Sequence, residues 1–258
     1  MGKVVAIANQ KGGVGKTTTG INLAASLVKT RRRVLLIDLD PQGNATMGSG
    51  VDKERVSGGS YEVILGLDTI AQVRVTTDGG YDLVPANNHL SGAEVELVEL
   101  DRRERRLRAA IEAVRGQYDF ILIDCPPSLN LLTVNALTAA DSIMIPMQCE
   151  YYALEGLTAL MNTVRKVREA LNPRLQIEGL LRTMFDPRNN LDNEVSAQLK
   201  EHFGDKLYRT IIPRNVRLAE APSHGKPVIA YDMQSKGAQA YLALAGEMLR
   251  REEEGQAA

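Results

Sequence analysis

The sequence predicts a single-domain α/β protein with a mostly parallel, twisted sheet that carries helices on both faces. Apolar runs of strand length alternate along the chain with segments of helical periodicity. Strands that are apolar throughout are typical of parallel sheets covered on both faces. The 258 residues contain no linker, internal repeat or low-complexity segment. We therefore expect one domain over residues 1–258, with 252–258 as a frayed tail.

Six apolar runs are the expected strands of the sheet. They cover residues 4–8, 34–37, 120–123, 143–145, 177–184 and 207–212. The turn Asp78-Gly79-Gly80 separates two further short runs and predicts a hairpin of 73–76 with 81–84. Helical periodicity predicts helices over 17–29, 61–67, 93–115, 154–171, 192–202 and 234–251. Residues 41–60 are rich in Gly, Ser and Asn, and we expect a mobile loop there.

Composition excludes several classes of protein. The formal net charge of −1 excludes a nucleic-acid binder that works through its overall charge, so any such role requires a local basic patch. The two cysteines, Cys125 and Cys149, indicate free thiols in a reducing compartment. No apolar run approaches the roughly 20 residues that span a bilayer, and the N-terminus enters a strand at once. We expect a cytoplasmic protein without an export signal.

A glycine-rich loop separates the first expected strand from the first expected helix. It reads Lys11-Gly12-Gly13-Val14-Gly15-Lys16-Thr17-Thr18. The order of strand, loop and helix is typical of a P-loop, in which backbone N–H groups and a helix N-terminus surround phosphate. Lys16 would reach the β- and γ-phosphates of a nucleotide, and the Thr17 hydroxyl would bind Mg²⁺. The alternative is a glycine-rich turn that binds nothing.

Two other expected strands end in carboxylates. The second strand leads into Asp38-Leu39-Asp40-Pro41-Gln42-Gly43-Asn44, and the strand 120–123 leads into Asp124-Cys125-Pro126-Pro127. Ligands of open α/β sheets sit at the carboxyl ends of the strands. Acids at these ends can orient water and metal beside a γ-phosphate, as Asp40 would, or join the Mg²⁺ shell, as Asp124 would. Each acid by itself could instead cap a helix or turn.

The phosphate loop also departs from the usual spacing, because Gln10 stands where a glycine is expected and an extra lysine, Lys11, follows it. With this loop and the two acidic segments, nearly the whole chain resembles the ParA/Soj family of DNA-partition ATPases, which belongs to the deviant Walker-A group of P-loop NTPases. Two later segments carry the resemblance further: Ile212-Pro213-Arg214-Asn215-Val216-Arg217 and Glu220-Ala221-Pro222-Ser223-His224-Gly225-Lys226-Pro227. The absence of an N-terminal helix-turn-helix extension suggests the short, chromosomal type.

The resemblance implies a role for each matching residue. Lys11 would cross the interface of an ATP-sandwiched dimer, and residues 11–18 would hold the nucleotide. Asp40 would position the attacking water, and Asp124 would act on Mg²⁺ through water. The implied catalytic residues are Lys11, Lys16, Asp40 and Asp124, and the implied metal residues are Thr17, Asp40 and Asp124. Pro213 and Asn215 would lie beside the adenine.

The resemblance also implies a function. The protein would be an ATPase with a slow intrinsic rate that uses ATP and Mg²⁺, forms a homodimer on ATP binding and then binds double-stranded DNA nonspecifically. A ParB-like centromere-binding protein would stimulate hydrolysis and so release the dimer, which drives chromosome or plasmid partition at the nucleoid. The basic residues best matched to DNA contact are Arg188 and Arg217, followed by Lys200, Arg214 and Lys226.

Three other readings compete with DNA partition. A MinD-like membrane ATPase would need a basic amphipathic helix at the C-terminus, but residues 247–254 turn acidic, so we expect no membrane partner. An iron–sulfur protein would need cysteines at a dimer axis, whereas Cys125 adjoins the nucleotide acid. An ATP-gated scaffold for other cargo would share every nucleotide motif and stays open. The arginine-rich segment 102–106 would be a solvated face or an anion site.

Overall fold

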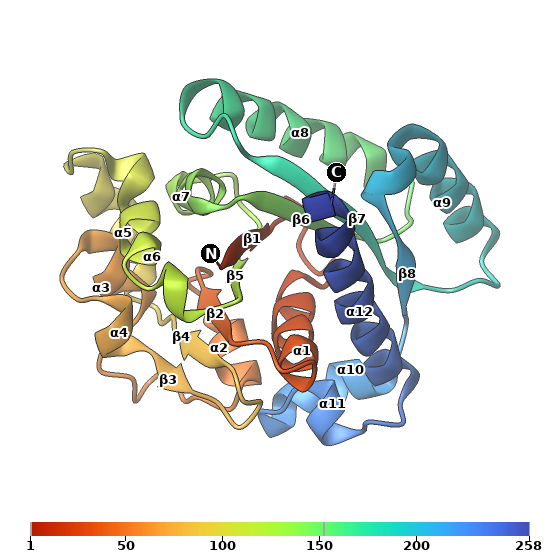
Figure 1. Ribbon diagram of the computed structural model, residues 1–258, viewed down its shortest axis with the longest axis horizontal. Coiled ribbons are helices and arrows are strands. Elements are labelled where there is room, and N and C mark those ends of the chain that lie inside the picture. The colour runs from red at the N-terminus through yellow and green to blue at the C-terminus, as the bar shows by residue number, and fades with distance from the viewer. Residues whose placement is uncertain (1, 152, 258) are drawn as a thin grey trace.

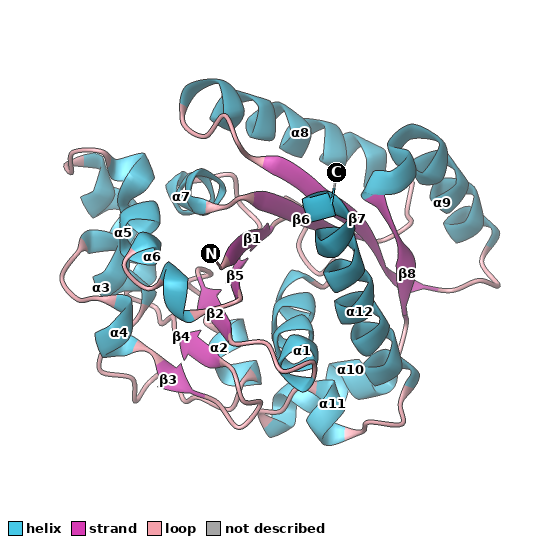
Figure 2. Ribbon diagram, viewed as in Figure 1, coloured by secondary structure: helices cyan, strands magenta, loops and turns pink. Residues whose placement is uncertain are grey.

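The computed structural model describes residues 2–151 and 153–257, and over these residues the chain forms one eight-stranded sheet between two layers of helices (Figures 1 and 2). The strands are β1 (Lys3–Ile7), β2 (Val34–Asp38), β3 (Val75–Thr76), β4 (Asp82–Val84), β5 (Phe120–Asp124), β6 (Ser142–Met147), β7 (Gln176–Phe185) and β8 (Leu207–Pro213). Their order across the sheet is β3-β4-β2-β5-β1-β6-β7-β8, and every neighbouring pair is parallel except β3 with β4. The predicted fold class is confirmed.

Helices cover both faces of the sheet. They are α1 (Lys16–Lys29), α2 (Asn44–Gly48), α3 (Ser60–Leu65), α4 (Ile70–Val73), α5 (Leu90–Val98), α6 (Arg106–Glu112), α7 (Leu131–Ala139), α8 (Ala153–Ala170), α9 (Asn190–Phe203), α10 (Val216–Glu220), α11 (Val228–Tyr231) and α12 (Lys236–Ala257). α1, α11 and α12 pack on one face, and α5 to α9 pack on the other (Figure 1). In the ranges described, no helix is long and apolar enough to cross a membrane.

The central strands are buried because both of their faces are covered. Alternate residues of β1 point to opposite sides: Val4 and Ala6 join one apolar core, whereas Val5 and Ile7 join the other. A strand in this position must be apolar throughout. The same pattern in β2 and β5, which are buried at every position, explains why the sequence predicted them so clearly.

The prediction of a single helix over 93–115 is wrong. α5 ends at Val98, Arg102 adopts the left-handed conformation with φ of 51°, and α6 begins only at Arg106. Two arginines of this segment donate to carbonyl groups, and Arg103, whose side chain is 42% exposed, also pairs with Glu104, as expected of a solvated face. Arg103 donates to the carbonyl of Val98, and Arg106 donates to two carbonyls at the end of α3. Leu97 and Leu107 are both still buried, so the apolar stripe survives the break.

The prediction that residues 41–60 form a mobile loop is wrong as well, and this segment is partly helical. It contains the short helix α2, in which Thr46 is fully buried and bonds to Asp38 through its backbone N–H and its hydroxyl. The sequence analysis also missed α7, whose start is capped by Asn130. At the other end of the chain, α12 continues to Ala257, through most of the expected frayed tail. Ala258, the last residue of that tail, lies outside the described residues.

Candidate functional site

The phosphate loop connects β1 to α1 at the carboxyl edge of the sheet. Gly13 and Gly15 have φ values of 71° and 86°, and Gly15 occupies the N-cap position of α1. This left-handed conformation is strained for any residue with a Cβ atom. A Cβ built on Gly12 or Gly13 would meet no atom within 4 Å, so open space lies in front of this part of the loop. The glycines therefore allow the backbone to curl, and the loop is open to solvent at Gly12 and Gly13.

Lys16 lies inside this loop. Its side chain curls back, and Nζ donates a hydrogen bond to the carbonyl oxygen of Lys11 at 3.0 Å. Burial lowers the pKa of Lys16, while the nearby charge of Asp124 acts in the opposite direction. Thr17 and Thr18 follow in the first turn of α1. Within the described residues this buried ammonium group donates to one carbonyl, so it is well placed to bind phosphate oxygens as well.

Asp124 has the most unusual environment in the site. It is fully buried, and among the described residues neither of its carboxylate oxygens has a hydrogen-bond partner. Burial and the negative charge of Asp38 raise its pKa well above the ordinary value, although the nearby Thr17 hydroxyl and Lys16 oppose this shift. Such a carboxylate needs a cation or a proton. Asp124 and Thr17 are thus the kind of oxygen donors that Mg²⁺ prefers, and this observation supports a metal at this place.

The described residues do not supply a complete metal cage. Within residues 2–151 and 153–257, no three His, Cys, Asp or Glu side chains are grouped so as to hold a metal ion. Mg²⁺ is usually held by one or two carboxylates together with water and the phosphates of a substrate. The donor set around Asp124 fits that arrangement.

Asp38 faces Asp124 across the β2–β5 pair but has a different role. Its carboxylate accepts hydrogen bonds from the backbone N–H and hydroxyl of Thr46 at 2.8 and 2.7 Å, which fixes α2 against β2. Burial is the main reason that the pKa of Asp38 rises to about 6. Asp40 lies two residues further on, and its Oδ1 accepts the backbone N–H of Gln42 at 3.0 Å. This turn fixes the Asp40 carboxylate, whose charge acts on both Lys16 and Asp124.

The backbone carbonyl of Lys11 accepts the hydrogen bond from Lys16, but the side chain of Lys11 has a different partner. Its side chain is 43% exposed and forms an ion pair with Glu150, which follows β6. The sequence analysis did not identify Glu150 as part of the site. The only available signal was its place just after a strand, at the edge where ligands bind.

Pro213 and Asn215 lie at the carboxyl end of β8. Pro213 is opposite Phe185 of β7, and the side-chain oxygen of Asn215 accepts the backbone N–H of Arg217 at 3.1 Å, so that Asn215 caps α10. β8 is separated from β1 by two strands, and three strand spacings amount to about 14 Å. These residues are on the same edge of the sheet as the phosphate loop, and their place beside the adenine stays a prediction.

The two best DNA candidates already have acidic partners. Arg188 is 88% exposed and pairs with Asp186 at 2.7 Å, and these hydrogen bonds lower the pKa of Asp186 to about 2. Arg217 pairs with Glu220 at 2.8 Å and with Asp232 at 3.3 Å.

The other three basic candidates do not lie together. Arg214 and Lys226 are exposed beyond the carboxyl end of β8, in the same region as Arg217. Lys200, in contrast, lies near the end of α9 beside a cavity of about 1100 Å³ that is also lined by Gln176 and Lys206. Gln176 begins β7 and Lys206 precedes β8, so Lys200 lies toward the opposite edge of the sheet.

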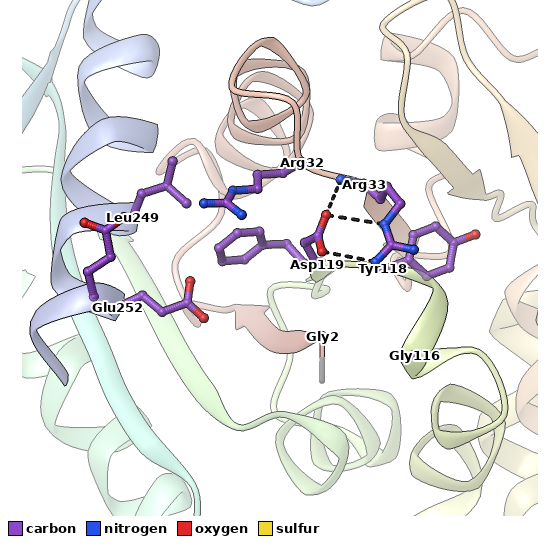
Figure 3. A pocket seen from close by; sticks show the side chains of 10 residues that line it. Gly2, Arg32, Arg33, Gly116, Tyr118, Asp119, Leu249 and Glu252 are labelled. Carbon is purple, nitrogen blue, oxygen red and sulfur yellow. Dashed lines mark hydrogen bonds and ion pairs between the residues drawn. The ribbon is translucent and has the colours of Figure 1, made fainter. Parts of the chain in front are cut away.

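A second cavity, of about 400 Å³, also lies away from the phosphate loop (Figure 3). It is lined by the residues that precede or begin the central strands, including Gly2 and Phe120, and by Leu249 of α12. The ion pair of Arg33 with Asp119, at 3.2 Å, forms part of its wall. Its position at the amino ends of the strands separates it from the nucleotide residues.

Comparison with known proteins agrees with this geometry. Residues 2–177 match the family model described as an AAA domain. Over 96% of the chain and 98% of the relative, the sequence is 57% identical to the sporulation initiation inhibitor protein Soj of Bacillus subtilis. Over 99% of the chain and 97% of the relative, it is 54% identical to the chromosome partitioning protein ParA of Caulobacter vibrioides.

Solved structures share the fold. A structure of cobyrinic acid a,c-diamide synthase from Mycobacterium smegmatis with a bound ATP analogue and magnesium has a TM-score of 0.87 and 38% identity, and covers 99% of this chain and 97% of that one. Its sequence is less similar to this chain than those of Soj and ParA. Taken with the phosphate loop and the two acidic strand ends, the comparisons lead to one conclusion: the chain belongs to the ParA/Soj family of chromosome-partitioning ATPases.

Proposed function

We propose that this protein is an ATP-dependent switch for chromosome or plasmid partition, in which hydrolysis of ATP releases a DNA-bound dimer. The observation that carries the proposal is the buried carboxylate of Asp124, which lies near Lys16 and has no hydrogen-bond partner in the described part of the chain. This arrangement is unfavourable in an isolated chain and becomes favourable when a nucleotide with Mg²⁺ is bound. The relatives named Soj and ParA support the biological role.

The residues of the site divide the chemistry between them. The loop amides and Lys16 bind the phosphates, and Thr17 and Asp124 would hold Mg²⁺, which neutralises charge on the phosphate oxygens when it is bound. Asp40 orients the attacking water, since its carboxylate is fixed by the turn at Gln42. Pro213 and Asn215 lie beside the base. A slow intrinsic rate is expected until the site is closed.

Lys11 closes the site from the partner subunit in this proposal. The ion pair of Lys11 with Glu150 joins two half-exposed side chains, and pairs of this kind contribute only about 0–1 kcal/mol. Lys11 can therefore leave Glu150 at little cost and contact the nucleotide of a second copy. A ParB-like centromere-binding protein would act on this closed homodimer to stimulate hydrolysis.

DNA binding would use the basic residues near the carboxyl ends of β7 and β8, namely Arg188, Arg214, Arg217 and Lys226. Phosphate contacts are additive and release counterions, so two copies of such a surface bind DNA much more strongly than one and lose affinity steeply with salt. This reasoning supports an ATP-dependent, nonspecific interaction with double-stranded DNA at the nucleoid.

The first experiment measures oligomeric size and DNA retention without nucleotide, with ADP and with ATP. Dimerisation and DNA binding only with ATP would support partition over a scaffold for other cargo. Lys16→Ala should abolish nucleotide binding, whereas Asp40→Ala should accumulate a DNA-bound ATP dimer. An Asp40→Ala protein that remains monomeric with ATP would contradict the role of Asp40.

The DNA surface is tested by a pair of charge reversals. Arg217→Glu should lose retardation of plasmid DNA at low salt and keep ATP binding. Lys200→Glu makes the same change in charge toward the opposite edge of the sheet and should retain DNA binding. Unchanged retardation by Arg217→Glu would remove this residue from the DNA surface.

A further inference from the structure

Two side chains from β7 and the end of β6 contact carbonyl groups of the phosphate loop. Thr183 of β7 is 2% exposed, and its hydroxyl donates a hydrogen bond to the carbonyl oxygen of Val14 at 2.8 Å. Gln148, which follows β6, donates from Nε2 to the carbonyl oxygen of Gly13 at 3.3 Å. Thr183 is 169 residues away from Val14 along the chain. Neither side chain belongs to a nucleotide motif of the sequence.

These contacts determine where the loop amides point. In a trans peptide the C=O and N–H groups point in opposite directions. When Thr183 holds the carbonyl of Val14, the N–H of Gly15 in the same peptide turns away from β7. When Gln148 holds the carbonyl of Gly13, the N–H of Val14 turns away from Gln148. Backbone N–H groups with a shared direction are what a phosphate loop needs to bind an anion.

Glycine makes such an external support necessary. Gly15 is in the left-handed region, and glycine has more accessible backbone conformations than any other residue. The peptide between Val14 and Gly15 is therefore poorly restrained by the loop itself. A Cβ built on Gly15 would lie 3.7 Å from the Thr183 methyl carbon, an ordinary contact distance, so Thr183 also packs against the loop.

The backbone beside Thr183 is itself unusual. Met184 lies in β7 and has φ of 51°, although it is not a glycine, and the Gln148 amide lies against its sulfur. The pairing of β7 with β8 also shifts in register between Arg182 and Phe185. Strained backbone of this kind persists only where surrounding contacts hold it, and it is often found at functional sites. Gln148 thus joins this irregular part of β7 to the phosphate loop.

We propose that Thr183 is a positioning residue for the nucleotide, whose hydroxyl orients the Gly15 amide toward the phosphates, and that Gln148 supports the neighbouring Val14 amide. The inference rests on the proposed function, in which the loop binds phosphate. Thr183 itself touches the loop and takes no part in the chemical step. Its removal should weaken binding of the phosphates rather than the hydrolysis of bound ATP.

The test compares Thr183→Val with Thr183→Ser. Valine keeps the shape of the side chain and removes the hydroxyl, whereas serine keeps the hydroxyl. Binding of ADP with Mg²⁺ is measured by titration calorimetry, because ADP avoids dimerisation. Loss of one buried hydrogen bond predicts affinity about fivefold to tenfold weaker for Thr183→Val, and Thr183→Ser should restore affinity to within about twofold of that of the unsubstituted protein.

Thr138→Val is the matched control. Thr138 in α7 is 1% exposed, and its hydroxyl has no hydrogen-bond partner in the described part of the chain. The same substitution there should leave ADP affinity unchanged. In steady-state assays, the KM for ATP should rise with Thr183→Val by the same factor as the ADP affinity falls, and kcat should change much less.

The outcomes separate this inference from the proposed function. If the unsubstituted protein binds neither ADP nor ATP with Mg²⁺, the proposed function fails. If it binds both and Thr183→Val binds ADP equally well, or Thr183→Ser is as weak as Thr183→Val, the positioning role fails. Should Thr183→Val not fold, Gln148→Met removes the second support without substituting a residue of β7. It should weaken ADP binding by about threefold, and an unchanged affinity would overturn the proposal.

Discussion

Replacing Asp124 with Asn should make the nucleotide-free protein more stable while it abolishes the response to Mg²⁺. The substitution keeps the size of the side chain and removes a fully buried charge whose two oxygens have no hydrogen-bond partner in the described residues. It also removes the repulsion between Asp124 and Asp38. Functional sites often lower the stability of the ligand-free protein, so a substitution that removes the function can raise that stability.

The magnitude follows from the missing hydrogen bonds. A buried charged group without hydrogen-bond partners costs about 1–3 kcal/mol or more. Among the described residues neither oxygen of Asp124 has a partner of hydrogen-bond geometry, although the Thr17 hydroxyl is close enough to oppose the rise in its pKa. A gain of about 1–3 kcal/mol, at 2–4 °C for each kcal/mol, should raise the unfolding temperature by roughly 2–12 °C.

The effect should depend on pH in a defined direction. A carboxyl whose folded pKa is raised binds its proton more tightly in the folded state, so the cost of its charge is present above the folded pKa and disappears below the unfolded value near 4. The gain from Asp124→Asn should therefore be large at pH 8 and shrink as the pH falls. An unchanged gain at acid pH would indicate an effect of packing.

The assay is thermal unfolding in EDTA without nucleotide, repeated with ADP and Mg²⁺. The ligands should stabilise the original protein and have little effect on Asp124→Asn. Asp119→Asn is the control, since Asp119 lies just before the same strand but pairs with Arg33, and its pKa is lowered. This control should be neutral or slightly destabilised. An Asp124→Asn protein that unfolds at or below the original temperature at pH 8 would refute the reasoning.

Three further predictions concern other contacts. Glu150→Gln should lower the free energy of unfolding by less than about 1 kcal/mol but increase ATP-dependent dimerisation measured by light scattering, because Lys11 is no longer held within its own subunit. Glu247 accepts two hydrogen bonds from Thr210, and these bonds help to lower its pKa despite its burial. Glu247→Gln should therefore cost about 1–3 kcal/mol at neutral pH, and this difference should diminish in denaturant titrations as acid protonates the original carboxyl. Arg106→Met should lose about 1–2 kcal/mol of stability in the same titrations, because the two carbonyls that end α3 lose their donor; an equal midpoint would show that solvent replaces the guanidinium.

The sequence by itself determined the fold class, the phosphate loop and the family. Continuously apolar strands can only be buried on both faces, and the order of Lys11, Lys16 and Thr17 between a strand and a helix is a local pattern. Such features depend on neighbours within a few residues, and they were therefore visible without a structure.

The tertiary structure decided what depends on distant contacts. The break after Val98 contains no proline or glycine before Arg103. The start of α6 is instead joined to α3 by Arg106, which donates to carbonyls about 40 residues earlier in the chain. The pairing of Lys11 with Glu150, the support of Val14 by Thr183 and the position of Lys200 away from Arg217 also join or separate residues far apart in the chain. A local sequence pattern cannot predict these contacts and separations. They depend on the order of the strands in the sheet, which decides which strand ends lie next to each other.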